Sequence, residues 1–315
     1  MRQTLPCIPE DAIAAARPFL KWAGGKTQLL DEIAARLPAG LAESEITTYV
    51  EPFVGGGAVF FWLAQHFAAI ERFVLLDVND DLVKCYTAIK GQCDAVVREL
   101  GFLQNSFLPL NGAGRKRLYL DIREEFNEEK TAGFTSKTAA KLIFLNRTCF
   151  NGLYRVNRKG RFNVPFGDYK NPRICDEQNL RAVSAVLQNA EVICGDFTDS
   201  DPYIDSQTFV YFDPPYRPLS PTASFTSYSK DSFSEEDQVR LAQFCRHVDE
   251  RGAKFLLSNS DPKNEDPSDR FFETHYCEFK IAAVKAKRAI NCKASGRGEI
   301  NELLLTNYGV SLQEK

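Results

Sequence analysis

The 315-residue sequence predicts an α/β fold in which helices cover both faces of a mixed, mostly parallel sheet. Two stretches of alternating strand and helix patterns support this prediction, and a helical, polar stretch separates them. The composition agrees, because 44% hydrophobic residues with 24 Phe and 11 Tyr can bury a large core and exclude a disordered chain. At about 100 to 200 residues per domain, the length suits one large domain or two smaller ones.

Strand and helix patterns first alternate between residue 47 and Asp77. A short strand-like run, residues 47–53, ends in Gly55-Gly56-Gly57, and residues 58–67 then have a helical pattern. Residues 72–76 form a second apolar strand that stops at Asp77. The order strand, glycine turn, helix, strand and acid is typical of half of a doubly wound α/β domain.

The alternation lapses between residues 80 and 175, where the pattern is at first helical and polar and where Gly112 and Gly114 indicate a loop. Strand-like runs return afterwards, with helical segments between several of them. We therefore interpret residues 80–175 as a second domain inserted into an α/β domain made of residues 1–79 and 176–315. The later strands are expected at residues 191–194, 208–212, 254–257, 275–281 and 302–306, and the helices at 177–187 and 235–251.

Charge is distributed unevenly around a net charge of -3. Residues 147–173 contain seven cations and one anion, and residues 279–298 contain six cations and no anion. A mildly acidic body with two basic strips suits a polyanion that is bound locally, and two solvated charged faces are the alternative. The cations of the first strip are Arg147, Arg155, Arg158, Lys159, Arg161, Lys170 and Arg173.

The nine Cys residues include no Cys-x-x-Cys pair and no nearby His cluster, which argues against a zinc site or a disulfide framework. Pro9, Glu10 and Asp11 stand where a secretory signal needs an apolar stretch. No run of about 18 apolar residues occurs. We expect a soluble, cytoplasmic protein that needs no metal.

The segment Asp213-Pro214-Pro215-Tyr216 follows the apolar run 208–212, at the strand end where open α/β sheets bind ligands. The Asp213 carboxylate and a carbonyl fixed by the next proline are two adjacent acceptors, which suit an NH2 group. An exocyclic base amine held through both hydrogens would be stabilised as its nitrogen attacks. Tyr216 offers an aromatic face to an extruded base. A tight turn without a chemical role is the alternative.

The glycine turn and Asp77, 22 residues beyond Gly55, suit a nucleoside ligand. Glycine permits close backbone approach, and an acid after the next strand can bind two ribose hydroxyls. This pattern does not distinguish a dinucleotide from S-adenosylmethionine. The segment Gly25-Lys26-Thr27 resembles the end of a phosphate-binding loop, but Leu20 occupies a position where that motif requires glycine, which argues against an NTPase. Lys26 can instead pair with a ligand carboxylate.

Aromatic residues interleave with the cations of the first basic strip. Arginine reads guanine through two hydrogen bonds in the major groove, while the other cations suit phosphates. One exposed aromatic suffices to wedge into the stack that a flipped base leaves, and most of the others belong to a core. These aromatics are Phe150, Tyr154, Phe162, Phe166 and Tyr169.

Four segments resemble, in their sequence and order, the Dam-type DNA adenine-N6 methyltransferases of the α group. They are PFLKWAGGK (18–26), EPFVGGG (51–57), NGLYRVN (151–157) and DPPY (213–216), and residues 218–226 look similar too. The resemblance extends from Pro18 to Tyr308. It implies a class I, Rossmann-like methyltransferase sheet in residues 1–79 and 176–315, with an inserted helical and β-hairpin DNA-recognition domain at 80–175.

The resemblance implies an enzyme that transfers the methyl group of S-adenosylmethionine directly to N6 of a flipped adenine in double-stranded DNA, usually within GATC. It implies no metal and no covalent intermediate. The implied catalytic residues are Asp213, Pro214, Pro215 and Tyr216. The implied cofactor contacts are Trp22, Lys26, Asp77 and Asp213, with Phe53, Asp196 and Phe197 lining the adenine pocket.

The implied DNA contacts lie mainly in the insert. Arg155 matches the guanine-reading arginine, and Phe150 matches an intercalating aromatic that is Tyr in some relatives. Lys21 matches a lysine that contacts the target from the catalytic domain. The neighbouring DNA contacts are Asn151, Leu153, Pro165 and Tyr169.

Two other functions are considered. An RNA or protein amide methyltransferase uses a related Pro-Pro-Tyr motif, but that motif usually begins with Asn and comes without the strip around Arg155. A DNA-binding regulator with an inactive site is the second alternative, and the intact Asp213, Lys26 and Asp77 argue against it. The resemblance leaves open whether the enzyme stands alone or is paired with a restriction endonuclease.

Overall fold

The computed structural model describes residues 16–217, 233–287 and 299–310. The chain forms two compact units. The helical unit comprises Met1–Gly25, Gly55–His66 and Asn79–Val192, and the sheet unit comprises Lys26–Val54, Phe67–Val78 and Ile193–Lys315. The helical unit therefore includes all of residues 80–175, together with segments from both sides of this range.

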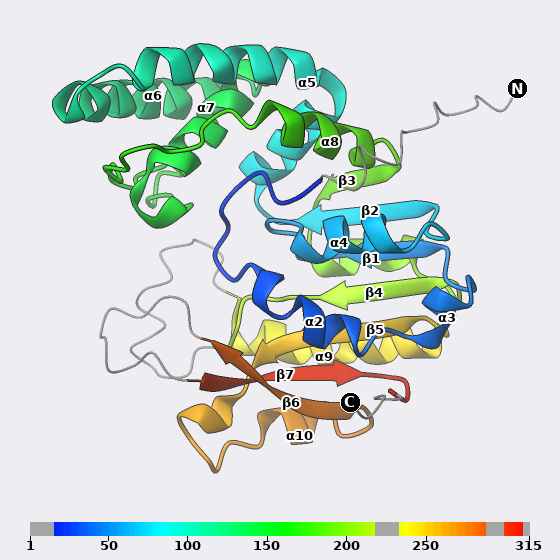
Figure 1. The fold of residues 1–315 in the computed structure, drawn as a ribbon. Helices are drawn as coiled ribbons and strands as arrows, with labels where there is room; N and C mark the ends of the chain where they lie inside the picture. Colours follow the sequence, from blue (N-terminus) through cyan, green and yellow to red (C-terminus); the bar gives the residue numbers. More distant parts are fainter. Residues whose placement is uncertain (1–15, 218–232, 288–298, 311–315) are drawn as a thin grey trace, which may run out of the picture. The chain divides into compact units, whose positions relative to one another are not determined.

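The described residues form one seven-stranded sheet in the order β3-β2-β1-β4-β5-β7-β6 (Figure 1). β1 is parallel to β2 and to β4, and β4 is parallel to β5. β7 is antiparallel to both β5 and β6. This mixed sheet confirms the predicted α/β class. The strands are β1 (Thr48–Glu51), β2 (Arg72–Asp77), β3 (Ala190–Cys194), β4 (Thr208–Phe212), β5 (Lys254–Ser260), β6 (Lys280–Lys287) and β7 (Glu299–Thr306).

The centre of the sheet is apolar on both faces, as expected for strands covered on each side. All five residues of β4 are buried. Helix α9 (Glu235–Glu250) begins with a capping box between Ser234 and Asp237, and its apolar residues share one core with alternate residues of β4 and β5. This packing fixes the strand ends from which the candidate catalytic segment emerges. The other helices of the sheet unit are α2 (Leu30–Ala34), α3 (Ala39–Ala42) and α10 (Phe271–His275), with short 3-10 turns η1 (Lys26–Gln28), η3 (Phe197–Tyr203) and η5 (Pro262–Asn264).

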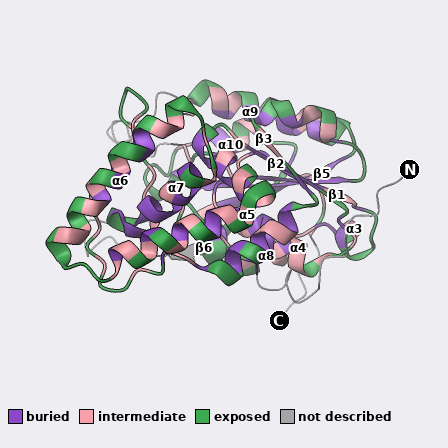
Figure 2. Ribbon diagram, turned by 90° about the horizontal axis from the view of Figure 1, so that it is seen from above, coloured by how far each residue is buried: buried purple, intermediate pink, exposed green. Residues whose placement is uncertain are grey.

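The helical unit contains five α-helices among its described residues. Helix α7 packs against α5 and α6, and α5 also packs against α8. Helix α7 is largely buried, whereas buried residues are a minority in α6 (Figure 2). The helices are α4 (Ala58–His66), α5 (Asp80–Phe107), α6 (Gly112–Ala132), α7 (Ser136–Thr148) and α8 (Glu177–Leu187), and the 3-10 turn η2 (Phe150–Gly152) lies between α7 and α8.

Two local predictions are wrong. Residues 275–281 were expected to be one strand, but α10 ends at His275 and β6 begins only at Lys280. The Tyr276 amide donates to the Phe272 carbonyl and the Phe279 amide to the Tyr276 carbonyl, so this backbone is paired in local turns and not in a sheet. Gly112 and Gly114 lie in the first turn of α6 and not in a loop, because the Asn111 side chain caps that helix through the Gly114 amide.

The described residues were also searched for membrane-spanning helices and for metal-binding groups. No helix among them is both long enough and apolar enough to span a membrane. No group of three or more His, Cys, Asp or Glu among them has the arrangement of a metal site.

Candidate functional site

Asp213 follows β4, the central strand of the sheet, and its carboxylate is held from two sides. Lys26 Nζ lies 2.6 Å from Asp213 Oδ1. The Ser258 hydroxyl on β5 donates to the same oxygen over 3.1 Å. Lys26 is only 6% exposed, and a lysine so buried requires a partner of opposite charge. The carboxylate is therefore fixed in orientation at the strand end.

Burial raises the pKa of Asp213 above its ordinary value, and the charge and hydrogen bond of Lys26 and the hydrogen bond of Ser258 offset part of this effect. Burial also raises the pKa of Tyr211, whose hydroxyl lies 3.0 Å from Ser258 Oγ. A neutral phenol, a serine and a carboxylate thus form one hydrogen-bonded chain beneath the site.

The residues after Asp213 are held by three other elements. Tyr216 donates from its hydroxyl to Glu302 Oε2 on β7 over 2.6 Å. The Tyr216 ring centroid lies 4.6 Å from Lys26 Nζ. The fully buried Gln238 of α9 donates to the Pro215 carbonyl over 2.9 Å. Both the backbone and the aromatic ring of the predicted catalytic segment are therefore positioned before any ligand binds.

Phe53 and Phe197, predicted to line an adenine pocket, come together in the sheet unit. Their ring centroids are 5.7 Å apart. Phe197 is only 1% exposed, whereas Phe53 is partly exposed. Phe53 is therefore the more exposed ring of this pair, and it packs against the buried Phe197.

Asp77 and Asp196 lie at the ends of β2 and β3. The Gly195 amide donates to the Asp77 carbonyl over 3.2 Å, which brings these ends together. Arg240 lies 2.5 Å from Asp196 Oδ1. Burial opposes ionisation of Asp196, but hydrogen bonds from Arg240 and Thr198 keep its pKa below the ordinary value. Asp196 therefore stays charged.

Trp22, the remaining predicted cofactor contact, belongs to the helical unit. It packs against Gly55, whose φ is +48° and where an added Cβ would lie 2.8 Å from the indole. Its other side stacks on Tyr154, with ring centroids 5.3 Å apart. The Tyr154 hydroxyl bonds to the buried Asp81 over 2.5 Å. The glycine at 55 is therefore required by both backbone conformation and space.

The predicted DNA contacts gather on residues 149–170 of the helical unit, which we call the recognition segment. Two isolated antiparallel bridges, Cys149↔Phe166 and Val156↔Phe162, make it a hairpin without regular strands. Phe150 is 51% exposed and is one of the few large exposed apolar side chains among the described residues. Asn151, Arg155 and Pro165 are also exposed, and Leu153 and Tyr169 are partly exposed.

Arg155 is oriented by its neighbour across the hairpin. Its Nε donates to Asn163 Oδ1 over 2.8 Å, and a terminal nitrogen donates to the Asn163 carbonyl over 3.3 Å. The hairpin tip turns at Gly160, with φ of +73°. The tip exposes Arg158 and Lys159. The segment thus exposes the oriented guanidinium of Arg155 and the two cations of its tip, Arg158 and Lys159.

Lys21 is tied to the recognition segment by close packing. Asn146 accepts from the Lys21 amide and donates to the carbonyls of Lys21 and Gly152. An added Cβ at Gly152, where φ is +64°, would lie 2.3 Å from the Lys21 side chain. Lys21 Nζ lies 4.7 Å from the centroid of the Tyr169 ring. These two predicted DNA contacts therefore lie side by side.

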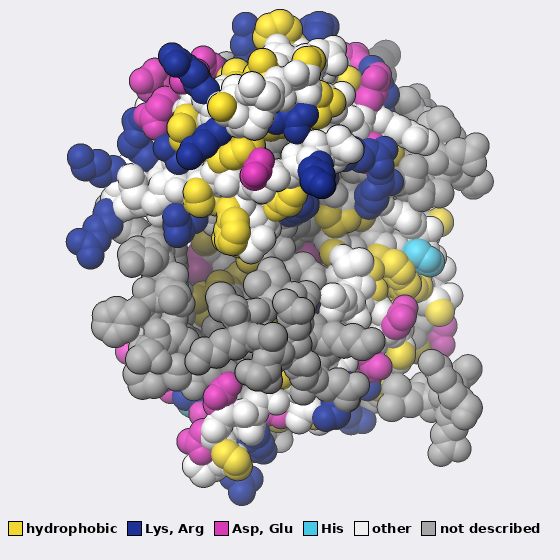
Figure 3. Space-filling view, turned by 60° about the vertical axis from the view of Figure 1, so that its left-hand side comes forward, with side chains coloured by type: hydrophobic (Ala, Val, Ile, Leu, Met, Phe, Trp, Pro, Cys, Tyr) yellow, Lys and Arg dark blue, Asp and Glu magenta, His cyan; other side chains and the backbone are white. Residues whose placement is uncertain are grey.

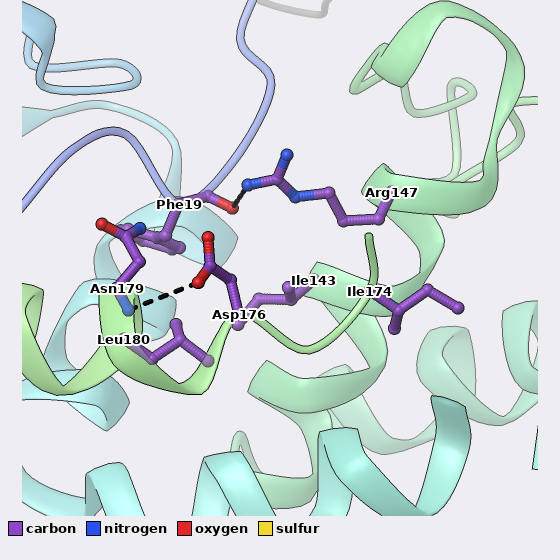
Figure 4. Close-up of a pocket in the computed structure, with 7 residues that line it drawn as sticks. All are labelled: Phe19, Ile143, Arg147, Ile174, Asp176, Asn179 and Leu180. Atoms are coloured by element: carbon purple, nitrogen blue, oxygen red, sulfur yellow. Dashed lines mark hydrogen bonds between the residues drawn. The ribbon is translucent and has the colours of Figure 1, made fainter. Parts of the chain in front are cut away.

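The basic strip divides into structural and exposed cations. Arg147 donates to the Phe19 carbonyl over 2.7 Å, and burial lowers its pKa (Figure 4). Arg161 pairs with Glu124 on α6 over 2.5 Å. On the helical unit, Figure 3 shows Lys and Arg side chains spread over the face that it draws, with acidic side chains between them. Only part of the strip is therefore available to a polyanion.

The side chains that hold the predicted site residues in place were not themselves predicted from the sequence. Ser258, Gln238 and Glu302 act on the catalytic segment, and Asn146 and Asn163 act on the recognition segment. Glu302 lies in β7, where a strand was predicted, but its contact with Tyr216 depends on the strand order. No local signal marks these residues. Residues 218–226, which also resembled the family, lie outside the described residues.

Comparison with known proteins connects this geometry to a reaction. Residues 22–290 match the model of the D12 class N6 adenine-specific DNA methyltransferases. The chain is 52% identical over 293 residues to Type II methyltransferase M.MjaIII of Methanocaldococcus jannaschii, covering 93% of this chain and 99% of that protein.

Two similar relatives are named DNA adenine methylase. The protein of Vibrio cholerae is 40% identical over 289 residues, covering 91% of this chain and 95% of its own. The protein of Escherichia coli K12 is 38% identical over 288 residues, covering 91% and 94%. The family match over residues 22–290 and these similar relatives show that the chain belongs to the D12 class of N6 adenine-specific DNA methyltransferases.

Proposed function

We propose that this adenine-specific DNA methyltransferase acts on the adenine of GATC in duplex DNA, uses S-adenosylmethionine as its methyl donor, and takes the adenine out of the stack. The observation that carries the proposal is the fixed carboxylate of Asp213 beside the Pro214 carbonyl at a strand end. An amine that presents two hydrogens is the ligand that these two acceptors suit.

Asp213 and the Pro214 carbonyl accept the two N6 hydrogens of adenine. As N6 forms its new bond, its lone pair leaves conjugation with the ring and its hydrogens become more acidic, so both hydrogen bonds strengthen in the transition state. Lys26 and Ser258 keep the carboxylate in place. Tyr216 stacks on the base, and Glu302 fixes its ring. No cysteine nucleophile is needed because the amine itself attacks.

The residues at the strand ends suit S-adenosylmethionine. Asp77 supplies a carboxylate for the ribose hydroxyls, and Phe53 supplies an aromatic face for the adenine. Trp22, Lys26, Asp196 and Phe197 complete the proposed set. When bound, the cofactor would supply an electrophilic methyl group, whose bond to sulfur would break as the bond to N6 forms, and one N6 hydrogen would then leave as a proton.

Removing individual contacts tests the cofactor assignment. Trp22→Ala and Lys26→Ala should each weaken S-adenosylmethionine binding by about one to two decades, while the choice of DNA site stays unchanged. Isothermal calorimetry with the cofactor checks this. Unchanged affinity in both variants would contradict the assignment.

The recognition segment is the proposed reader of DNA sequence. Arg155 reads guanine, Phe150 enters the space that the flipped adenine leaves, and Asn151, Leu153, Pro165, Tyr169 and Lys21 make the neighbouring contacts. The exposure of Phe150 and the oriented guanidinium of Arg155 support these roles. GATC is palindromic, so both strands should be methylated.

Methylation rates on matched duplexes test the proposal as a whole. A GATC duplex is compared with duplexes that differ from it at each single base, and with RNA of the same sequence. Equal rates on GATC and its variants would contradict the GATC assignment. Single-molecule mapping of methylated bases in cells with and without the protein gives the site independently.

Pairing with a restriction endonuclease is a separate prediction, which the name of the M.MjaIII relative suggests. Loss of the methyltransferase should then expose the host DNA to cleavage at the same sequence. Survival with uncut DNA would indicate an enzyme that stands alone.

A further inference from the structure

Helix α6 carries four polar side chains at intervals of four residues, Arg115, Tyr119, Arg123 and Asn127, which we call the α6 ladder. Residues four apart lie along one side of a helix. Each member hydrogen-bonds to the backbone of residues 162–170. We propose that the α6 ladder sets the sequence specificity of the enzyme by positioning the recognition segment. This inference rests on the proposed reading of DNA by that segment.

The contacts follow one order along the helix. Asn127 donates to the Phe162 carbonyl over 3.0 Å and accepts from the Phe162 amide over 2.6 Å. Tyr119 donates to the Val164 carbonyl over 2.7 Å, and Arg123 donates to the same oxygen over 3.3 Å.

Arg115 completes the order at the other end of the segment. It donates to the carbonyls of Tyr169 and Lys170 over 3.3 and 2.8 Å. The segment therefore runs along α6 in the opposite direction to the helix, attached at three levels.

The α6 ladder supplies hydrogen-bond partners that neighbouring strands would supply in a regular sheet. Between Cys149 and Phe166 the hairpin has two isolated bridges, and the amides of Phe150, Asn157 and Asn163 donate across it to backbone carbonyls. The carbonyls of Phe162 and Val164 are bound by α6 instead. Tyr119 and Phe162 are at most 1% exposed, and Asn127 is 2% exposed. Buried backbone groups must find partners, and here the side chains of α6 supply them. Burial raises the pKa of Tyr119, which keeps its hydroxyl a donor.

The α6 ladder is connected to Arg155 because alternate residues of the extended segment 162–164 point in opposite directions. Phe162 and Val164 are buried toward the helix, and Asn163 between them is partly exposed. Asn163 is the residue that holds the Arg155 guanidinium. Moving the Phe162 and Val164 backbone would therefore move the group that orients the proposed guanine reader.

Tyr119→Phe tests the proposal, because it removes one oxygen and leaves the ring packing in place. The measurement is kcat/KM on GATC against duplexes changed at each base. We expect discrimination at the base read by Arg155 to fall about three- to tenfold, the equivalent of one hydrogen bond. The kcat on saturating GATC should stay close to that of the wild type. Asn127→Ala loses two bonds and should lower discrimination further.

Tyr308→Phe is the matched control. Its hydroxyl donates to the Arg36 carbonyl over 2.9 Å in the sheet unit, so the change removes the same kind of bond elsewhere. Discrimination should stay unchanged in this variant. The double variant of Tyr119→Phe and Arg155→Ala should discriminate no worse than Arg155→Ala alone, because both changes act on one contact.

The outcomes separate this inference from the proposed function. If Arg155→Ala lowers discrimination but folded Tyr119→Phe does not, the α6 ladder has no part in specificity. If Arg155→Ala also leaves discrimination unchanged, the recognition segment does not read DNA and the proposed function fails. Thermal denaturation establishes folding, and Tyr119→Phe carries the test alone if Asn127→Ala does not fold.

Discussion

The proposed catalytic segment, residues 213–216, and the recognition segment are positioned by different means. The catalytic segment continues a fully buried strand with hydrogen-bonded neighbours on both sides. The recognition segment has isolated bridges and is attached to a helix by side chains. The first segment extends directly from a paired strand and is held by side chains from several elements around it. The second segment is held mainly by side chains of one helix.

This difference indicates where sequence change is tolerated. At the end of β4, the Asp213 carboxylate is packed against Lys26 and Ser258, so substitutions there should act on the rate of transfer. On the recognition segment, Phe150 and Arg155 are exposed and are not part of the core. Substitutions of these two residues should therefore act on the choice of DNA sequence. Substitutions in the recognition segment could therefore change the DNA sequence that is chosen while the transfer reaction stays the same.

The largest expected effect is that of Asp213→Ala, which should lower the transfer rate by at least about 10²- to 10³-fold, since an acceptor that binds the transition state is lost. DNA binding should persist because the recognition segment is untouched. Single-turnover methylation and duplex binding measure the two separately. Turnover within about tenfold of the wild type would contradict the role of Asp213.

Arg155→Ala should cost about 1 to 3 kcal/mol of discrimination at one base position. Lys159→Ala provides the contrast at the exposed hairpin tip. As a phosphate contact, it should weaken binding to all sequences alike and flatten the salt dependence. Binding titrations at several salt concentrations, on GATC and altered duplexes, check both. A base-specific loss in Lys159→Ala would reverse the assignment.

The pH dependence should reflect Asp213, whose pKa burial raises while Lys26 and Ser258 lower it. The ionised carboxylate is the acceptor, so kcat should fall on acidification through a pKa above the ordinary 3.8. Lys26→Gln should move this acidic limb to higher pH at saturating cofactor. The effect on stability runs the other way. Because the raised pKa favours the protonated carboxyl in the folded chain, the contribution of Asp213 to the free energy of unfolding decreases as pH rises through that pKa. An acidic limb that does not move in Lys26→Gln would show that another group titrates.

The smallest expected effect is that of Glu302→Gln, which keeps an oxygen to accept from Tyr216 but loses the charge. We expect kcat/KM to fall by a few fold, since a bond to a charged group exceeds a neutral one by about 1 kcal/mol. Glu302→Ala should lose more. Fluorescence of 2-aminopurine at the target position reports the stacking directly. Identical stacking in both variants would show that Tyr216 needs no such anchor.

The sequence predicts the elements whose signals are local. Residues 208–212 form β4 as expected, since a short apolar run followed by Asp-Pro-Pro marks both a buried strand and its end. The strand expected at 275–281 is wrong because the amides of Tyr276 and Phe279 bond within local turns, which the apolar pattern of this stretch does not reveal.

The supporting contacts are beyond local prediction for a different reason. Glu302 and Tyr216 are 86 residues apart, and Asn127 and Phe162 are 35 apart. Only the strand order and the helix packing bring them together. Tertiary packing, and not propensity, decides such pairs.

The position of β7 has a consequence for how the enzyme is made. β6 joins the sheet through β7, which lies between it and β5, although β7 is the later of the two in the chain. Synthesis proceeds at about 5 to 20 residues per second from the N-terminus. The edge of β5 that pairs with β7 therefore stays unpaired until β7, the last strand, is synthesised. Glu302, the anchor of Tyr216, arrives in that last strand. An unfinished chain therefore lacks the residue that holds the Tyr216 ring even when residues 149–170 are already complete.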